Sequence, residues 1–148
     1  MILDIKGDII ADGWRKVYAF FDIDCTSPTM VKEAFANLPA GDRMQVRINS
    51  PGGDVLAGQE IYTFLRDRDD VDIVVESLAG SAASVIAMAG PSSISPVGML
   101  MIHDVSIAGA TGNKNDMQKT SQVLAEYDKA LAQAYMEKTG KTVDEILA

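Results

Sequence analysis

The sequence predicts an α/β fold with a largely parallel sheet and a long C-terminal helix. β-type runs alternate with helical runs along most of its 148 residues. Each of the central β-type runs leads through a turn into a helix, which is the arrangement of parallel strands joined by right-handed crossovers. The length fits one domain, 1–148, and the 47% of hydrophobic residues are enough for a core.

Two β-type runs and a helix are predicted in the N-terminal part. The run "ILDIKGDII" at 2–10 has strand character, with Gly7 and Asp8 marking a bulge or turn, and "KVYAFFDI" at 16–23 is a second β-type run. The segment "SPTMVKEAFANL" at 27–38 is typical of a helix, because Ser27 can cap it and Pro28 suits its first position. Its apolar face consists of Met30, Val31, Ala34, Phe35 and Leu38.

The middle of the chain repeats the order strand, turn, helix. The run 43–50 alternates apolar and polar residues like a half-buried strand, and 55–67 follows as a helix. The β-branched run 71–77 is the next strand, followed by a small-residue turn and the helical segment 84–90. The segment 97–105 contains another strand, which we expect to end at His103.

Two helices are predicted at the C-terminal end. The longer spans about 115–139 and ends at Gly140, and the second opens at "TVDEILA", where Thr142 and Glu145 have the spacing of a capping box. Only about one turn of the second helix precedes Ala148, and so short a helix is marginal in water. We therefore expect the sequence to continue in a parent protein, or this end to pack against something.

Composition disfavours several classes of function. The net charge is −8 and basic residues are scattered singly, so we expect no nucleic-acid partner. No apolar run reaches the ~18–20 residues of a membrane span, and the N-terminus does not read as a signal peptide, so a soluble cytoplasmic protein is expected. The single cysteine, Cys25, excludes an intrachain disulfide and reads as an ordinary thiol. The glycine-rich nucleotide-binding patterns are absent, and we expect no cofactor and no metal.

Three features with chemical potential fall at the ends of predicted strands, where sites form in open α/β sheets. They are Ser50 to Gly53, Gly80 to Ser84, and His103. His103 is the only histidine, so any serine hydrolase using a histidine base must use it. The pair Gly52-Gly53 fits a tight turn, or a backbone N–H that approaches a phosphate or an oxyanion.

Ser84 and Ser81 are the candidate reactive serines. Ser84 follows two alanines and opens a helix, as a nucleophile on a crowded strand-to-helix turn would, and the N–H of Val85 can serve as an oxyanion donor. The elbow pattern G-x-S-x-G is not matched, and composition alone favours helix packing.

Three segments taken together, "RINSPGGDVLAGQEIY", "GSAASVIAMAG" and "MLMIHDV", closely resemble the Clp-type serine peptidases. The likeness runs from Arg43 to the C-terminus and points to the phage and prophage branch, the Clp-like head-maturation proteases. It implies a ClpP/crotonase-like spiral of β-β-α repeats. It also implies Ser84 as nucleophile, His103 as general base, and the backbone N–H groups of Gly53 and Val85 as the oxyanion hole. Ser81 aligns with a variable position.

The resemblance further implies a polypeptide substrate bound as an added β-strand and a homo-oligomeric ring, heptameric or stacked in pairs, in the cytoplasm of a bacterial host cell. The residues placed along that substrate strand are Gly52, Asp54, Val55, Asp104, Val105 and Ser106. The family docks its unfoldase ring with an N-terminal extension, whereas Met1 here leads directly into the first strand. We therefore expect no ATPase partner.

The family's third catalytic residue, an aspartate, is expected a few residues beyond Ala148. Within the chain, Asp144 and Glu145 are nearby acids, but the capping box explains Glu145 better. Losing such an acid can lower the rate about 10⁴-fold. The alternatives are a fragment of a longer chain, a weak Ser–His dyad, or an inactive ring-forming subunit.

Two other chemistries fit the same superfamily less well. A crotonase-type enzyme would bind coenzyme A and use paired carboxylates, which the sequence does not offer. A Ser–Lys dyad would use Lys114, Lys119 or Lys129, but the motif M-I-H at 101–103 argues against it.

Overall fold

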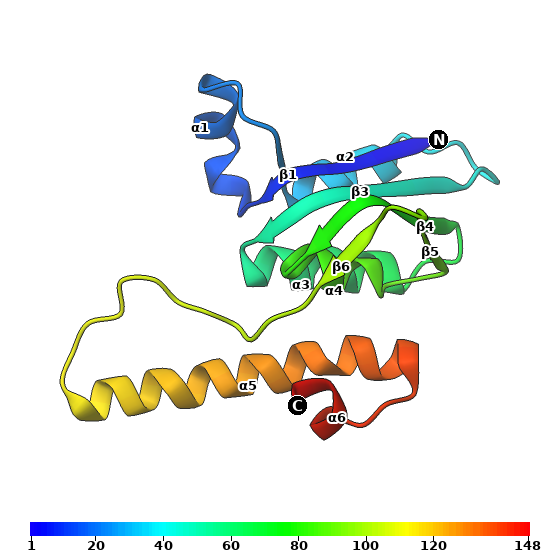
Figure 1. The fold of residues 1–148 in the computed structure, drawn as a ribbon. Coiled ribbons are helices and arrows are strands. Elements are labelled where there is room, and N and C mark those ends of the chain that lie inside the picture. Colours follow the sequence, from blue (N-terminus) through cyan, green and yellow to red (C-terminus); the bar gives the residue numbers. More distant parts are fainter. The chain divides into compact units, whose positions relative to one another are not determined.

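The structure, a computed structural model, describes residues 1–148 and contains two compact units, Met1–Ile102 and His103–Ala148 (Figure 1). The first unit holds a parallel sheet in the order β2-β1-β3-β4-β5, in which β6 also pairs with β4. Its strands are β1 (Ile2–Ile9), β2 (Cys25–Thr26), β3 (Met44–Gly53), β4 (Val71–Gly80), β5 (Ser92–Ile94) and β6 (Met99–Met101). Its helices are η1 (Asp12–Trp14), α1 (Arg15–Phe20), α2 (Pro28–Ala36), α3 (Val55–Arg66) and α4 (Ala82–Ala87). The predicted α/β class with a parallel sheet is confirmed.

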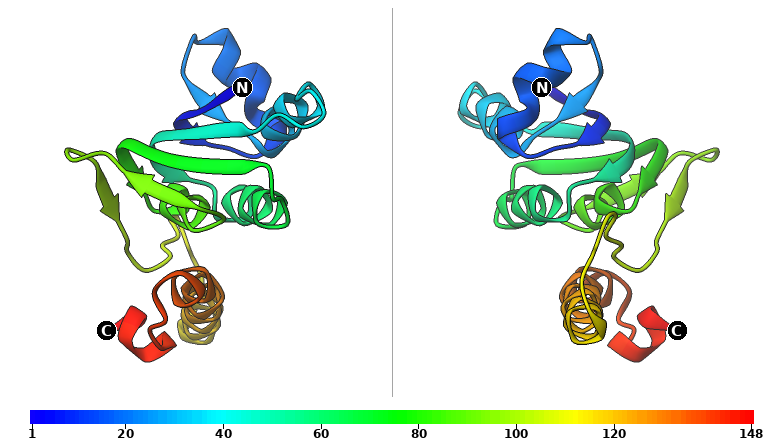
Figure 2. Two further views of the ribbon diagram at one scale, coloured as in Figure 1. Left: turned by 90° about the vertical axis from the view of Figure 1, so that its right-hand side faces the viewer. Right: turned by 90° about the vertical axis from the view of Figure 1, so that its left-hand side faces the viewer.

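The core of this unit lies between one face of the sheet and its helices. Alternate residues of β3 and β4 are buried, such as Val46, Ile48 and Ile73, and α3 and α4 run along that face (Figure 2). The intervening side chains point to the opposite face, as the pleat requires. They include Arg47 and Glu76, which form an ion pair of 3.4 Å. Because the strands of this sheet are all parallel, their carboxyl ends lie at the same edge of the sheet.

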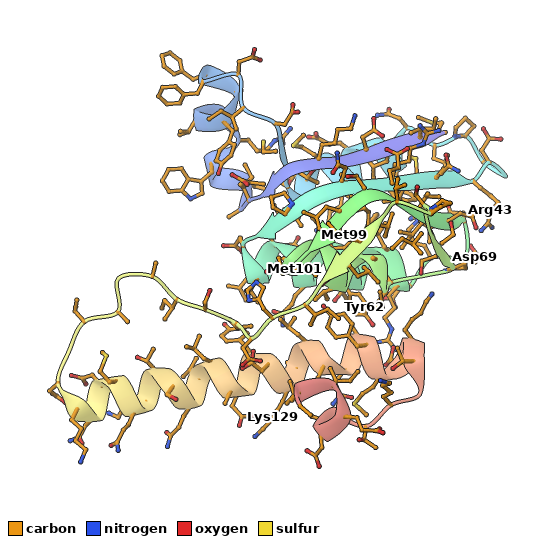
Figure 3. The ribbon with its side chains drawn as sticks, viewed as in Figure 1. Arg43, Tyr62, Asp69, Met99, Met101 and Lys129 are labelled. Atoms are coloured by element: carbon orange, nitrogen blue, oxygen red, sulfur yellow. The ribbon has the colours of Figure 1, made fainter.

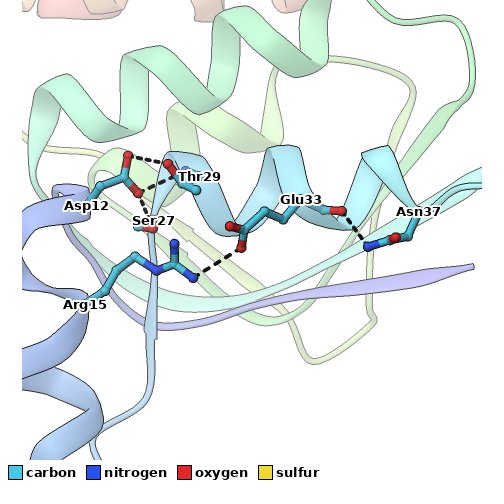
Figure 4. Close-up of polar contacts among 6 residues, drawn as sticks. All are labelled: Asp12, Arg15, Ser27, Thr29, Glu33 and Asn37. Atoms are coloured by element: carbon cyan, nitrogen blue, oxygen red, sulfur yellow. Dashed lines mark hydrogen bonds and ion pairs between the residues drawn. The ribbon is translucent and has the colours of Figure 1, made fainter.

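Helix α2 forms where predicted, but its cap is different. Ser27 occupies the N-cap position without accepting a bond from the helix. Its hydroxyl donates to Asp12 Oδ1 at 2.6 Å, and Asp12 accepts from the backbone N–H and the hydroxyl of Thr29 (Figure 4). The expectation that Ser27 caps the helix was wrong: Asp12, fifteen residues earlier, supplies the acceptor.

The prediction of a β-type run at 16–23 was also wrong, because residues 16–20 belong to helix α1. Arg15, Lys16 and Ala19 are good helix formers. Two of the aromatic residues in this run, Phe20 and Phe21, are exposed, at 81% and 63%. β-propensity depends on packing against neighbouring strands, and α1 pairs with none.

The remaining boundaries differ in detail. The predicted bulge at Gly7 is present as a register shift between Lys6 and Asp8. The strand predicted to end at His103 ends at Met101, because its partner β4 ends at Gly80, opposite Met101. Helix α4 begins at Ala82, before the predicted start at Ser84, since Ser81 occupies its N-cap position.

The second unit contains α5 (Lys114–Thr139) and α6 (Val143–Leu147). Asn113 and Asp116 form a capping box at the start of α5, and Gly140 ends it with φ 72°. The predicted capping box of Thr142 and Glu145 is confirmed at the start of α6. No helix of the structure combines the length and the apolar character needed to cross a membrane.

Candidate active site

The glycine pair after β3 lies against the turn that leads into α4. Gly52 has φ 103°, and a Cβ atom added to it would stand 2.6 Å from the Gly80 carbonyl oxygen and 2.6 Å from Ser81 Cβ. Only glycine accepts both this backbone conformation and this closeness. Two of the three predicted strand-end features, 50–53 and 80–84, are thus in contact.

Hydrogen bonds hold the glycine pair in place. The buried Ser50 hydroxyl donates to the Gly7 carbonyl at 2.6 Å and accepts from the Gly52 N–H at 3.1 Å. Gly53 stands in register with Ile9, and a Cβ atom on it would overlap the Ile9 carbonyl. The Asp54 N–H donates to that carbonyl at 2.8 Å.

Ser81 absorbs the sharp change of direction between β4 and α4. Its φ of 49° and ψ of −123° form a conformation rare for a residue with a side chain. Such strain costs about 1–3 kcal/mol and persists only where the surroundings impose it. Here the Ser81 N–H donates to the Met101 carbonyl of β6 at 2.8 Å. Sequence reasoning placed Ser81 in a turn but gave no sign of this strain.

Ser84 is the third residue of α4 and is fully buried. Its hydroxyl donates to the Ser81 carbonyl at 2.6 Å. The same carbonyl accepts from the Ser84 N–H at 2.9 Å and, more weakly, from the Val85 N–H at 3.4 Å. The candidate nucleophile and one candidate oxyanion donor therefore converge on a single acceptor.

His103 is the first residue of the second unit and follows Met101 by two positions. Its Nδ1 lies 2.6 Å from the Asp104 carbonyl oxygen. A carbonyl oxygen can only accept, so this bond requires the proton on Nδ1 and leaves Nε2 unprotonated in the neutral ring. This is the tautomer that a general base acting through Nε2 needs. Ser84 and His103 lie in different units, and their pairing stays a prediction.

The residues predicted along a substrate strand fall into two groups. Gly52, Asp54 and Val55 belong to the first unit, where Val55 is the first residue of α3 and the Asp54 carboxylate caps that helix by accepting from the Ala57 N–H at 2.8 Å. The others, 104–106, belong to the second unit, where the Val105 N–H donates to Asp128 Oδ1 at 2.6 Å. Sequence reasoning did not single out Asp128, and no motif marks it.

Strand β6 runs beside the Ser81 turn and pairs only with β4. Its side chains are exposed, Met99 at 63% and Met101 at 40% (Figure 3). An exposed apolar edge strand is able to pair with another chain. No group of three or more histidine, cysteine, aspartate or glutamate side chains lies close enough together to hold a metal ion.

The chain is similar in sequence to one protein family and to several of its curated members. The sequence model of the family described as Clp protease matches residues 23–148. The chain is 32% identical over 112 residues to the ATP-dependent Clp protease proteolytic subunit of Bacteroides fragilis, covering 73% of this chain and 54% of the relative. It is 32% identical over 105 residues to proteolytic subunit 1 of Leifsonia xyli, covering 68% and 53%. The chain therefore spans about half the length of these curated relatives.

Proposed function

Because this chain belongs to the Clp protease family, we propose that it is a serine endopeptidase with Ser84 as nucleophile and His103 as general base. The contact between the Gly52 segment and the turn that presents Ser84 carries the proposal. It brings a glycine-lined backbone to the start of a helix at the carboxyl edge of a parallel sheet. The relatives' names, proteolytic subunits of Clp proteases, support the same reaction class.

In the proposed reaction, Ser84 Oγ attacks the carbonyl carbon of the peptide bond while its proton passes to His103 Nε2. The hydroxyl leaves the Ser81 carbonyl, which keeps its bond from the Ser84 N–H. The negative charge on the carbonyl oxygen is stabilised by the N–H groups of Gly53 and Val85. The 3.4 Å bond of Val85 is weak enough for the oxyanion to replace it. One such donor contributes about 3–4 kcal/mol in the transition state.

The tetrahedral intermediate then collapses. The C–N bond breaks, the amine takes the proton from His103, and an acyl group remains on Ser84. Water attacks this ester and gives a proton to His103. The ester C–O bond then breaks, His103 returns the proton to Ser84 Oγ, and the carboxylic acid leaves. No step uses a nucleotide, so we expect cleavage of short peptides without ATP.

The finer assignments extend this proposal. The motifs at 47–62, 80–90 and 99–105 support a phage or prophage head-maturation role, with the chain acting in a homo-oligomeric ring. The substrate would bind as an added strand near Gly52 and residues 104–106, and the open edge of β6 beside the Ser81 turn suits such pairing.

A fluorophosphonate probe tests the catalytic assignment, because it reacts only with an activated serine. We expect one adduct per chain by intact mass. Ser84→Ala should abolish the adduct, and His103→Ala should slow its formation at least a hundredfold. Ser81→Ala is the matched control and should still label. An adduct that survives Ser84→Ala would overturn the assignment.

The buried Ser84 hydroxyl also fits a second function, a non-catalytic subunit of a Clp-type ring. In that case the protein assembles but neither labels nor cleaves peptides, even in a version extended at its C-terminus. Measuring the mass in solution together with labelling separates the two functions.

A further inference from the structure

Within residues 103–148, one peptide group joins the His103 ring to the Asp128 carboxylate. The Asp104 carbonyl accepts from His103 Nδ1 at 2.6 Å, and the Val105 N–H donates to Asp128 Oδ1 at 2.6 Å. The Asp104 C=O and the Val105 N–H belong to the same planar peptide unit. The two hydrogen bonds therefore form one continuous chain from imidazole to carboxylate.

The polarity of this chain matches the needs of a general base. In a trans peptide the C=O and the N–H point in opposite directions, so the ring meets the negative end of the peptide dipole and the carboxylate meets the positive end. A bond from N–H to a charged carboxylate is short and strong. It also polarises the peptide, which makes the carbonyl on the far side a better acceptor.

We propose that Asp128 is a positioning residue that holds His103, through the Asp104–Val105 peptide, in the tautomer with the proton on Nδ1. In this tautomer Nε2 is the basic nitrogen. A carboxylate bonded directly to Nδ1 has the same effect in other serine peptidases. Asp128 reaches the ring one peptide away. The effect of Asp128 on catalysis rests on the proposed function, whereas its effect on the position of the His103 ring proton does not.

Two other acids on α5 have roles of their own. Glu126 pairs with Lys129 at 2.9 Å on the surface, and Asp116 caps the helix start. Glu126 is thus a matched control, because it lies two residues from Asp128 on the same helix. Glu126→Gln removes a carboxylate without touching the 103–105 segment.

Nitrogen-15 NMR of the imidazole tests the proposal directly, because His103 is the only histidine. Spectra in alkaline buffer, where the ring is neutral, distinguish the Nδ1–H from the Nε2–H tautomer. We expect Nδ1–H in the unmodified chain, in Glu126→Gln and in Asp128→Asn, whose amide oxygen still accepts. Asp128→Ala should move the ring toward Nε2–H, the form that dominates in free histidine. An Nε2–H ring in the unmodified chain, or no change in Asp128→Ala, would overturn the proposal.

The rate of fluorophosphonate labelling gives the catalytic consequence. Loss of a supporting hydrogen bond behind a functional histidine lowers activity about 10- to 100-fold. We expect that loss in Asp128→Ala, substantial rescue in Asp128→Asn, and no change in Glu126→Gln. Equal rates in all variants would refute the positioning role. If no variant labels, including the unmodified chain, the proposed peptidase function fails, while the tautomer spectra still decide the role of Asp128. Should Asp128→Ala not fold, an Nε2–H ring in the unmodified chain or in Asp128→Asn would still overturn the proposal.

Discussion

Among single residues near the candidate site, Gly52 has little freedom to change. Its φ of 103° and the nearby Gly80 carbonyl leave no room for a side chain. The Gly52 peptide is also bonded to Ser50, so the glycine cannot move without disturbing the end of β3. The position of the segment that carries the candidate oxyanion donor Gly53 therefore depends on Gly52 having no Cβ atom.

Gly52→Ala should lower the free energy of unfolding by about 2 kcal/mol or more, since backbone strain and a steric clash add together. It should also slow labelling of Ser84. Gly41→Ala is the control, because Gly41 has φ 88° but no atom within 4 Å of an added Cβ. Urea unfolding of both variants separates strain from clash. Equal losses of stability would show that the Gly80 carbonyl imposes no constraint.

The candidate site could be predicted at this scale only in part. Ser84 and His103 were singled out because they stand in distinctive motifs, and their catalytic roles stay a prediction. The bonds of the Ser84 hydroxyl and the Val85 N–H to the Ser81 carbonyl were not predicted, because they depend on the torsion angles of Ser81. Asp128 was missed because its partner, Val105, lies far along the chain and is reached only through the path of the intervening loop.

Among the secondary-structure elements, α2 depends on a cap from outside its own segment. Asp12 precedes α1 and bonds to Ser27 and Thr29 at the start of α2, while Arg15 pairs with Glu33 further along that helix. These contacts fasten the N-terminal segment to the helix.

The Asp12 cap should make stability depend on pH. Burial alone would raise the pKa of Asp12, but hydrogen bonds from Ser27 and Thr29 and the charge of Arg15 outweigh it and hold the pKa below its ordinary value. A carboxyl with a lowered folded-state pKa stabilises above its unfolded-state pKa, and the effect disappears as the pH falls through the folded-state pKa. Asp12→Ala should therefore lower the free energy of unfolding by about 1 kcal/mol at neutral pH.

That difference should begin to shrink below about pH 4, the ordinary aspartate pKa that the carboxyl has in the unfolded chain, and should vanish only below the lowered folded-state pKa. Thermal unfolding at pH 7 and pH 3 measures it. Asp42→Ala, at an exposed loop carboxylate, should lose little stability at either pH. A cost for Asp12→Ala that is the same at both pH values would contradict the charged cap.

The elements differ in how far local sequence determines them. Strands β3 and β4 were predicted because their alternating and β-branched residues are buried in the way the pattern implies. The segment 16–23 was mispredicted because Phe20 and Phe21 are exposed, and their β-propensity depends on packing against neighbouring strands, which they lack. Strand β5 has only three residues and forms by pairing with β4, which no local pattern reveals.

On the scale of the whole molecule, exposed apolar side chains bear on the proposed ring. Trp14, Phe20 and Phe21 are 58%, 81% and 63% exposed on η1, α1 and the following turn. The rings of Phe20 and Phe21 are in edge-to-face contact with centroids 5.0 Å apart, so they present one apolar patch. Large exposed apolar patches are typical of association surfaces.

If this patch is covered in the assembly, replacing Phe20 and Phe21 together by serine should reduce the mass in solution toward that of one chain, 15.8 kDa. Lys16→Ser changes the same helix outside the patch and should leave the mass unchanged. Light scattering coupled to size-exclusion chromatography measures both. A double variant with the mass of the unmodified protein would show that other surfaces hold the ring.

The parallel register of β1 and β3 has a practical consequence for handling the protein. The Met1 ammonium group donates to the Arg43 carbonyl at 2.8 Å, where β3 is about to begin, whereas Ile9 pairs with Gly53 at the other end of both strands. The length of β1 therefore separates the amino terminus from the glycine pair. A linker attached at Met1 would fix the protein to a bead or sensor surface by the edge of the sheet opposite Gly53, and would keep the glycine pair away from that surface.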